Sequence, residues 1–273
     1  MKVYCFGEKE KPVIFLLPGT CCHWKGNFGK VIELLEEYFQ VACVSYDGFD
    51  ETEQTEFPTM TEETEKIEQY IMKEFDGHIC AAYGCSLGGS FVGLLAARGN
   101  IHMDYGILGG SDLDQSGKLW AKLMTKLMMP VFYPFITKGE IKIPFMKKKM
   151  DRMMAEENGY IRAFMDMIKT PDVDMSRVTK KTVENQFYSD LITPLPDQID
   201  PAGTQIHILY ALKMGEKYRA RYTKHFARPI LHELDLQHEE LLAVYPGEWV
   251  KVIAEICGRK TGDSAARFKA KKN

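Results

Sequence analysis

Residues 79–89 join an apolar run to a glycine-rich turn: Ile79-Cys80-Ala81-Ala82-Tyr83-Gly84-Cys85-Ser86-Leu87-Gly88-Gly89. The first five residues suit a buried strand, and the small and apolar residues that follow Gly89 suit a helix packed closely on a sheet. Gly84, Ser86 and Gly88 fit the pattern Gly-x-Ser-x-Gly, which holds a serine in a sharp turn between strand and helix. Such a turn forces unfavourable backbone angles on the serine, so its neighbours must be small. This context predicts a nucleophilic serine at position 86.

Similar alternation of apolar runs and helical spacing covers most of the chain. Continuous apolar runs predict further strands at residues 13–17, 41–44, 101–108, 206–210 and 230–236. Segments with helical spacing lie between most of these runs, and the last helix presents Trp249, Val252, Ile253 and Ile256 on one face. Alternating strands and helices predict an α/β fold with a doubly wound, mostly parallel sheet. Ligands of such sheets bind at the carboxyl ends of the strands.

Residues 112–204 lack this strand rhythm and predict a mainly helical insertion. The segment is too apolar for a disordered loop, with predicted breaks at Pro130, Pro134 and Pro144 and a helical stretch over residues 150–168. Ten of the 15 methionines lie in this segment, which predicts an adaptable apolar pocket above Ser86. The predicted organisation is therefore a core at residues 1–111 and 205–258, the helical insertion at 112–204, and a basic polar tail at 259–273.

Composition narrows the classes of function. The 273 residues are 45% hydrophobic, which excludes disorder as the main state, and the net charge of -3 gives no reason to expect a nucleic-acid partner. No apolar run approaches the ~20 residues of a membrane-spanning helix. The N-terminus lacks the apolar core of a signal peptide, so we expect a cytoplasmic protein.

The cysteines predict free thiols rather than a metal site or disulfides. Their number, seven, is odd, and five lie within or beside apolar runs and are expected to be buried: Cys5, Cys43, Cys80, Cys85 and Cys257. The sequence Cys21-Cys22-His23 has no second cluster at matching spacing, so no metal is expected. Phosphate-binding glycine loops are also absent from the sequence.

With Ser86 in this context, the chain resembles the α/β-hydrolase family over residues 3–257, least so in the helical insertion. The resemblance implies an oxyanion hole formed by backbone amides after the first core strand, where the chain has Leu17-Pro18-Gly19-Thr20, and after the nucleophile. The donors would be Thr20, or alternatively Cys21, together with Leu87. Pro18 stands where the family often has His, a tolerable departure because the donor is backbone.

The same resemblance implies the remaining catalytic groups. The family's histidine follows the last strand, where this chain has Gln237-His238-Glu239, so His238 is the expected base. In the family's chain order, the catalytic acid lies between the nucleophile and the histidine, after the strand that here spans residues 206–210. Glu216 is the expected acid, with Asp112 and Asp114 as alternatives. The insertion occupies the position of the family's lid, and the expected pocket residues are His23, Trp24, Met124 and Met128.

These residues predict a serine hydrolase that cleaves a small-molecule carboxylic ester with an apolar group through an acyl-enzyme on Ser86. The family's mechanism implies no cofactor. Two alternatives remain open: thioester, peptide-amide or C–C bond cleavage by the same triad, and a hydrolase-fold binding protein without activity.

Overall fold

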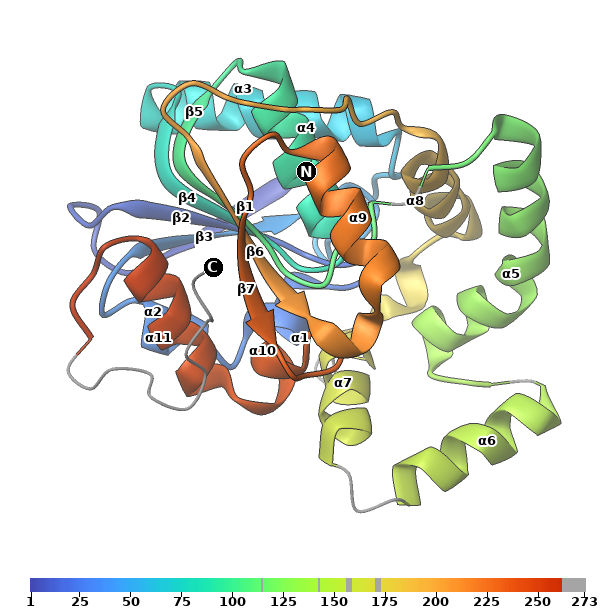
Figure 1. Cartoon of the computed structure of the whole chain (residues 1–273). Helices are drawn as coiled ribbons and strands as arrows, with labels where there is room; N and C mark the ends of the chain where they lie inside the picture. Colours follow the sequence, from blue (N-terminus) through green and yellow to red (C-terminus); the bar gives the residue numbers. More distant parts are fainter. Residues whose placement is uncertain (114, 142, 156–158, 170–172, 262–273) are drawn as a thin grey trace.

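A computed structural model describes residues 1–113, 115–141, 143–155, 159–169 and 173–261. Seven strands form one sheet in the order β1-β3-β2-β4-β5-β6-β7 (Figure 1). Every neighbouring pair is parallel except β1 and β3, so the predicted mostly parallel sheet is confirmed. The strands span Lys2–Phe6 (β1), Val13–Leu17 (β2), Gln40–Ser45 (β3), His78–Gly84 (β4), His102–Leu108 (β5), Gln205–Ala211 (β6) and Ile230–Leu234 (β7).

Helices cover both faces of the sheet. On one face α3 (Met60–Phe75) and α4 (Leu87–Arg98) bury residues such as Ile67 and Phe91. On the other face lie α1 (Trp24–Phe28), α2 (Ile32–Leu35), α10 (Glu240–Val244) and α11 (Pro246–Ile256), whose Trp249 is fully buried. Burial of the apolar strands on both faces is what their continuous apolar runs predict, because a parallel sheet is covered on each side.

The segment between β5 and β6 is helical. It contains α5 (Lys118–Lys138), α6 (Pro144–Ala155), α7 (Gly159–Lys169), the short 3-10 helix η1 (Met175–Arg177) and α8 (Lys180–Ile192). Figure 1 shows α5 and α6 at the outer side of the molecule, away from the sheet. The remaining elements, η2 (Leu212–Met214) and α9 (Glu216–His225), connect β6 to β7.

Several local expectations are wrong. Pro130 and Pro134 lie inside α5 instead of breaking it, because α5 packs along α8 and that contact outweighs the local cost of a proline, about 3 kcal/mol. The described residues of the stretch at 150–168 are helical as expected, and they belong to α6 and α7. Strand β1 was missed because it is short and half-buried, and Cys5 within it is exposed.

All seven cysteines are free thiols, and the other four of the five expected to be buried are buried. The strands predicted at residues 13–17, 41–44, 79–83, 101–108, 206–210 and 230–236 are all present, as β2, β3, β4, β5, β6 and β7. In the part of the chain that the structure describes, no helix is both long enough and apolar enough to cross a membrane.

Candidate active site

Ser86 occupies the tight turn between β4 and α4. Its backbone angles are φ 49° and ψ -113°, a region that residues with a side chain rarely adopt. A Cβ on Gly84 would lie 2.1 Å from the carbonyl carbon of Gly88, and one on Gly88 would lie 2.1 Å from the Leu17 carbonyl oxygen. Glycine at these two positions is therefore required for the turn to close against β2. The half-buried Ser86 is held at the carboxyl end of the central strand.

The loop after β2 lies beside the serine. A Cβ built on Gly19 would lie 3.5 Å from Cβ of Ser86, and the Gly19 amide donates to Oδ1 of Asn27 at 2.8 Å. The Cys21 amide donates to Oε1 of buried Gln186 at 2.6 Å. Because that amide is already engaged, Thr20 is the better candidate for an oxyanion donor. Within the described residues, neither the Thr20 amide nor the Leu87 amide donates to a protein acceptor.

His238 lies in the segment between β7 and α10, against the end of β5. A Cβ on Gly110 would lie 2.4 Å from its Nδ1 atom, so only glycine leaves room for the imidazole. The ring packs edge-on against Phe164 of α7, with centroids 5.7 Å apart. The Tyr160 hydroxyl, also on α7, donates to the His238 carbonyl oxygen at 2.9 Å. A helix of the 112–204 segment therefore contacts the candidate base directly.

The Glu239 side chain connects the Ser86 turn, β4 and the segment after β5 by hydrogen bonds. Its Oε1 atom accepts hydrogen bonds from the amides of Ser86 at 2.9 Å and Gly110 at 2.5 Å, and Oε2 accepts from the Tyr83 hydroxyl at 2.8 Å. The side chain is buried, so these three donors replace the water that a carboxylate would otherwise bind. Sharing one oxygen between Ser86 and Gly110 brings the nucleophile turn next to the glycine that supports His238.

Sequence reasoning missed Glu239. Its backbone has φ 53°, which no pattern in Gln237-His238-Glu239 indicates. A carboxylate directly beside a candidate catalytic histidine was the only available signal. Its partners come from β4, the nucleophile turn and the end of β5, so they become neighbours only in the folded sheet.

In the described part of the chain, neither Glu216 nor Asp112 forms a hydrogen bond with the His238 imidazole. Glu216 is exposed in the first turn of α9, and Asp112 is exposed after β5, while Asp114 lies outside the described residues. Across the ranges that the structure describes, the His238 side chain forms no hydrogen bond with Ser86, Glu216 or Asp112. Catalytic hydrogen bonds are often long in the absence of substrate, so substitutions of Glu216 and Asp112 are the test of the acid.

The four expected pocket residues occupy two separate places. Met124 and Met128 are half-buried on α5. His23 and Trp24 are buried at the start of α1, where the Trp24 ring stacks on Tyr4 with centroids 4.9 Å apart. Trp24 therefore packs against the edge strand β1.

His23 is a buried neutral histidine at a helix start. Its Nδ1 accepts from the Lys25 amide at 3.2 Å as the N-cap of α1, and its Nε2 is buried without a partner in the described structure. Burial lowers the pKa of His23 to about 4. The ring therefore stays uncharged over the physiological range and supplies a fixed cap.

We expect the free energy of unfolding to fall as pH drops from 6.5 to 4.5, and less so in His23→Asn. The folded-state pKa of about 4 lies below the unfolded value near 6.5, so the unfolded chain takes up the proton first. Protonation of His23 in the unfolded chain therefore lowers the free energy of unfolding by about 2 kcal/mol between pH 6.5 and pH 4.5. Asparagine keeps a capping oxygen and cannot titrate. Urea unfolding at both pH values measures the difference, and an unchanged pH dependence in the variant would contradict this role.

Comparison with known proteins gives the fold. A crystal structure of a putative alpha/beta hydrolase family protein from Desulfitobacterium hafniense superposes with a TM-score of 0.72 at 18% identity, over 93% of this chain and 99% of that one. The chain has the α/β-hydrolase fold. The MenH structure from S. aureus has a TM-score of 0.69 at 13% identity, over 94% of this chain and 99% of that one.

A third α/β-hydrolase-fold neighbour is the enol-lactonase from Burkholderia xenovorans LB400. Its TM-score is 0.62 at 14% identity, over 94% of this chain and 96% of that one. No protein-family model and no curated protein sequence matches the chain. The fold is therefore shared along nearly the whole chain, although the sequence identity to these three structures is only 13% to 18%.

Proposed function

We propose that the chain is a serine hydrolase that cleaves a carboxylic ester with an apolar group through an acyl-enzyme on Ser86. The observation that carries the proposal is the strained position of Ser86, between a helix start and a loop with uncommitted amides at Leu87 and Thr20. Structural neighbours described as an esterase and an enol-lactonase support acyl chemistry.

In the proposed reaction the Ser86 hydroxyl attacks the ester carbonyl while His238 takes its proton. The carbonyl oxygen becomes an oxyanion, and the amides of Thr20 and Leu87 donate to it. His238 then returns the proton to the leaving alcohol, which leaves an ester of Ser86. Water, deprotonated by His238, attacks that ester and releases the carboxylic acid and free serine.

The 112–204 segment is proposed to act as the lid. Helix α7 contacts His238 through Phe164 and Tyr160, and the Met167 carbonyl accepts from Nδ2 of Asn27 at 3.2 Å. Asn27 in turn accepts from the Gly19 amide next to the proposed oxyanion donor Thr20. A helix bonded to both sides of the site can exclude water and shape the acyl pocket.

Graded p-nitrophenyl esters test the substrate class. We expect turnover, with a preference for chains longer than acetyl because the segment over the site is apolar. Thioester and aminoacyl substrates in the same assay cover the alternative chemistries on these residues. Labelling of Ser86 by a fluorophosphonate without ester turnover would favour those alternatives, and no labelling would favour a binding protein.

For the acid we retain Glu216, the carboxylate that follows β6 in chain order, with Asp112 and Asp114 as alternatives. We expect Glu216→Gln to lower kcat at least a hundredfold, since the imidazolium loses the carboxylate that orients and stabilises it. Asp112→Asn tests the alternative acid in the same assay, and kcat on the preferred ester is the measurement. Full activity of Glu216→Gln together with a loss in Asp112→Asn would move the acid to the end of β5.

A further inference from the structure

Two histidines and an aspartate meet at the amino ends of β4 and β5, the end of these strands opposite to Ser86. His78 is the first residue of β4 and His102 the first of β5, whereas Ser86 follows the carboxyl end of β4. The parallel register pairs His78 with His102. Asp104, two residues further along β5, shares the face of His102 because side chains alternate along a strand. The register therefore collects three metal-ligating side chains on one face.

Their donor atoms have the spacing of a metal site. Nε2 of His78 lies 3.0 Å, and Nε2 of His102 lies 3.2 Å, from Oδ1 of Asp104. One donor atom from each residue lies within 4.8 Å of the other two. Tetrahedral ligands at zinc bond lengths of 2.0–2.1 Å are about 3.3 Å apart. We propose that His78, His102 and Asp104 bind a Zn²⁺ ion.

The chemistry and surroundings favour this ligand. Imidazole nitrogens favour zinc and its neighbours in the transition series over magnesium or calcium, and a carboxylate completes a common zinc donor set. Three protein ligands leave a fourth position for water or a small anion. All three side chains are partly exposed, so the ion can enter from solvent.

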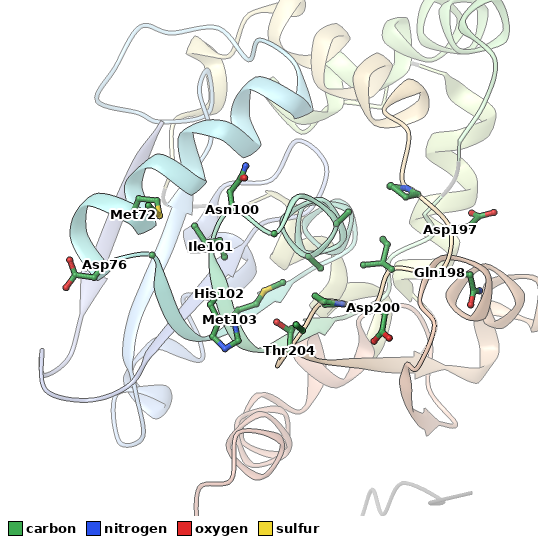
Figure 2. Close-up of a pocket in the computed structure, with 18 residues that line it drawn as sticks. Met72, Asp76, Asn100, Ile101, His102, Met103, Asp197, Gln198, Asp200 and Thr204 are labelled. Atoms are coloured by element: carbon green, nitrogen blue, oxygen red, sulfur yellow. The ribbon is translucent and has the colours of Figure 1, made fainter.

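A cavity adjoins the proposed site. Its volume is about 760 Å³, and His102 is part of its lining. Figure 2 shows His102 with the other lining residues Met72, Asn100, Asp200 and Thr204. The cavity lies between α3, α4 and the segment before β6. His102 thus belongs to both the donor cluster and the cavity wall.

Zinc titration of the metal-free full chain tests the site. We expect the protein to bind one equivalent of Zn²⁺ in competition with a chromophoric chelator. His102→Ala and Asp104→Asn should each weaken zinc binding at least tenfold. Saturating Zn²⁺ at ten times Kd should raise the wild-type Tm by about 3 °C and that of His102→Ala by less. Both readouts are independent of ester turnover.

The control is His232→Gln, which removes one member of another close histidine pair, with Nδ1 of His207 2.9 Å from Nε2 of His232. We expect zinc affinity to be unchanged in this variant. Equal affinity in the wild type, His102→Ala and Asp104→Asn would overturn the proposal. A loss confined to His232→Gln would also overturn it and would assign the ion to the other pair.

An independent observation concerns the outer face of α5. Its large apolar side chains are between 55% and 88% exposed: Leu119, Trp120, Leu123 and Leu127. At about 100° per residue they fall within one arc of the helix, which we call the α5 stripe. The opposite side of α5 buries Ala121, Thr125 and Met129 where the helix packs on α8. The stripe is thus not needed to hold α5 in place.

Positive charge accompanies the stripe. Lys118, Lys122 and Lys126 each precede one of its leucines and border it, and α5 contains no acidic residue. Over residues 118–152 there are nine basic and two acidic residues, in a chain whose net charge is -3. On α6, the next helix along the chain, Phe145 is 75% exposed and is followed by exposed Lys147, Lys148 and Lys149.

We propose that the α5 stripe docks on an anionic lipid surface. Leucine and tryptophan side chains enter the boundary between headgroups and acyl chains, while the bordering lysines contact acidic headgroups. The charge around the stripe disfavours a second copy as the occupant, because two such faces would repel. Docking does not depend on the proposed catalytic activity.

Flotation with vesicles of phosphatidylcholine, with and without 30% phosphatidylglycerol, tests this docking. We expect binding to the anionic vesicles, weaker at high salt, and the same binding by Ser86→Ala. Substituting Lys118, Lys122 and Lys126 by Glu should lower the partition coefficient at least a hundredfold, because each lysine contributes about fivefold and the charge is also reversed. Substituting the stripe's three leucines by Ser should abolish binding.

Matched controls are Lys180→Glu with Lys181→Glu, and Leu34→Ser with Met72→Ser, which alter exposed residues elsewhere. We expect these variants to bind as the wild type does. Absence of binding, equal binding to neutral vesicles, or equal losses in controls and stripe variants would each overturn the proposal. A wild-type dimer that the leucine substitutions convert to a monomer would assign the stripe to a second copy instead.

Discussion

Ser86→Ala is expected to lower kcat on the preferred ester by about 10⁴ to 10⁶-fold while the protein remains folded. The Ser86 hydroxyl is the one protein group in the proposed mechanism that forms a covalent bond with the substrate. Removing it leaves only the modest catalysis by the oxyanion amides and by substrate binding. Steady-state kinetics on wild type and variant measures the effect.

The control for Ser86→Ala is Ser90→Ala, which alters another serine of α4 one helical turn further on. We expect the Ser90 variant to keep its kcat within a few fold. The thermal unfolding of Ser86→Ala should resemble that of the wild type, because no hydrogen bond of the Ser86 side chain is lost among the described residues. Retention of more than a tenth of the activity in Ser86→Ala would contradict its role as nucleophile.

Glu239→Ala is expected to cost about 3–5 kcal/mol in free energy of unfolding and to lower kcat about a hundredfold. The substitution leaves the amides of Ser86 and Gly110 and the Tyr83 hydroxyl without their acceptor. Each buried donor left unpaired costs about 1–3 kcal/mol. The Ser86 turn has unfavourable backbone angles and loses one of the contacts that hold it, which is why kcat should fall as well.

Glu239→Gln separates geometry from charge. Its amide oxygen can accept from both backbone amides, while its NH2 group can donate to the Tyr83 oxygen, so we expect most of the stability and part of the activity to return. Glu240→Gln is the matched control, since Glu240 also accepts from a backbone amide, that of Gln237 at 2.7 Å. Denaturant unfolding and kcat are the measurements. Wild-type stability in Glu239→Ala would contradict the proposed network.

The fold was predictable because its signals are local. The run at 79–83 and the glycines around Ser86 specify a strand, a turn and a helix within twenty residues, and similar runs repeat along the chain. Strand β1 was not predicted because half-buried edge strands have a weak apolar pattern. The breaks predicted at Pro130 and Pro134 are wrong because the cost of a proline in a helix is read from the local sequence. The packing of α5 on α8, which offsets that cost, depends on residues about sixty positions away.

The site was predictable only where chain order carries the information. Positions after particular strands indicate Ser86, His238 and the Thr20 loop. Glu239 and the cluster of His78, His102 and Asp104 depend on which strands lie side by side, and their spacing along the chain resembles no motif. Buried hydrogen-bond networks and sheet registers of this kind appear only once the sheet is assembled.

Mass spectrometry of the protein after brief exposure to an activated ester or a fluorophosphonate tests the central claim most directly. We predict one added acyl or phosphonyl group on the peptide that contains Ser86, absent from Ser86→Ala and slower to form in His238→Gln. An adduct on another residue, or no adduct while the ester is still hydrolysed, would contradict nucleophilic catalysis by Ser86.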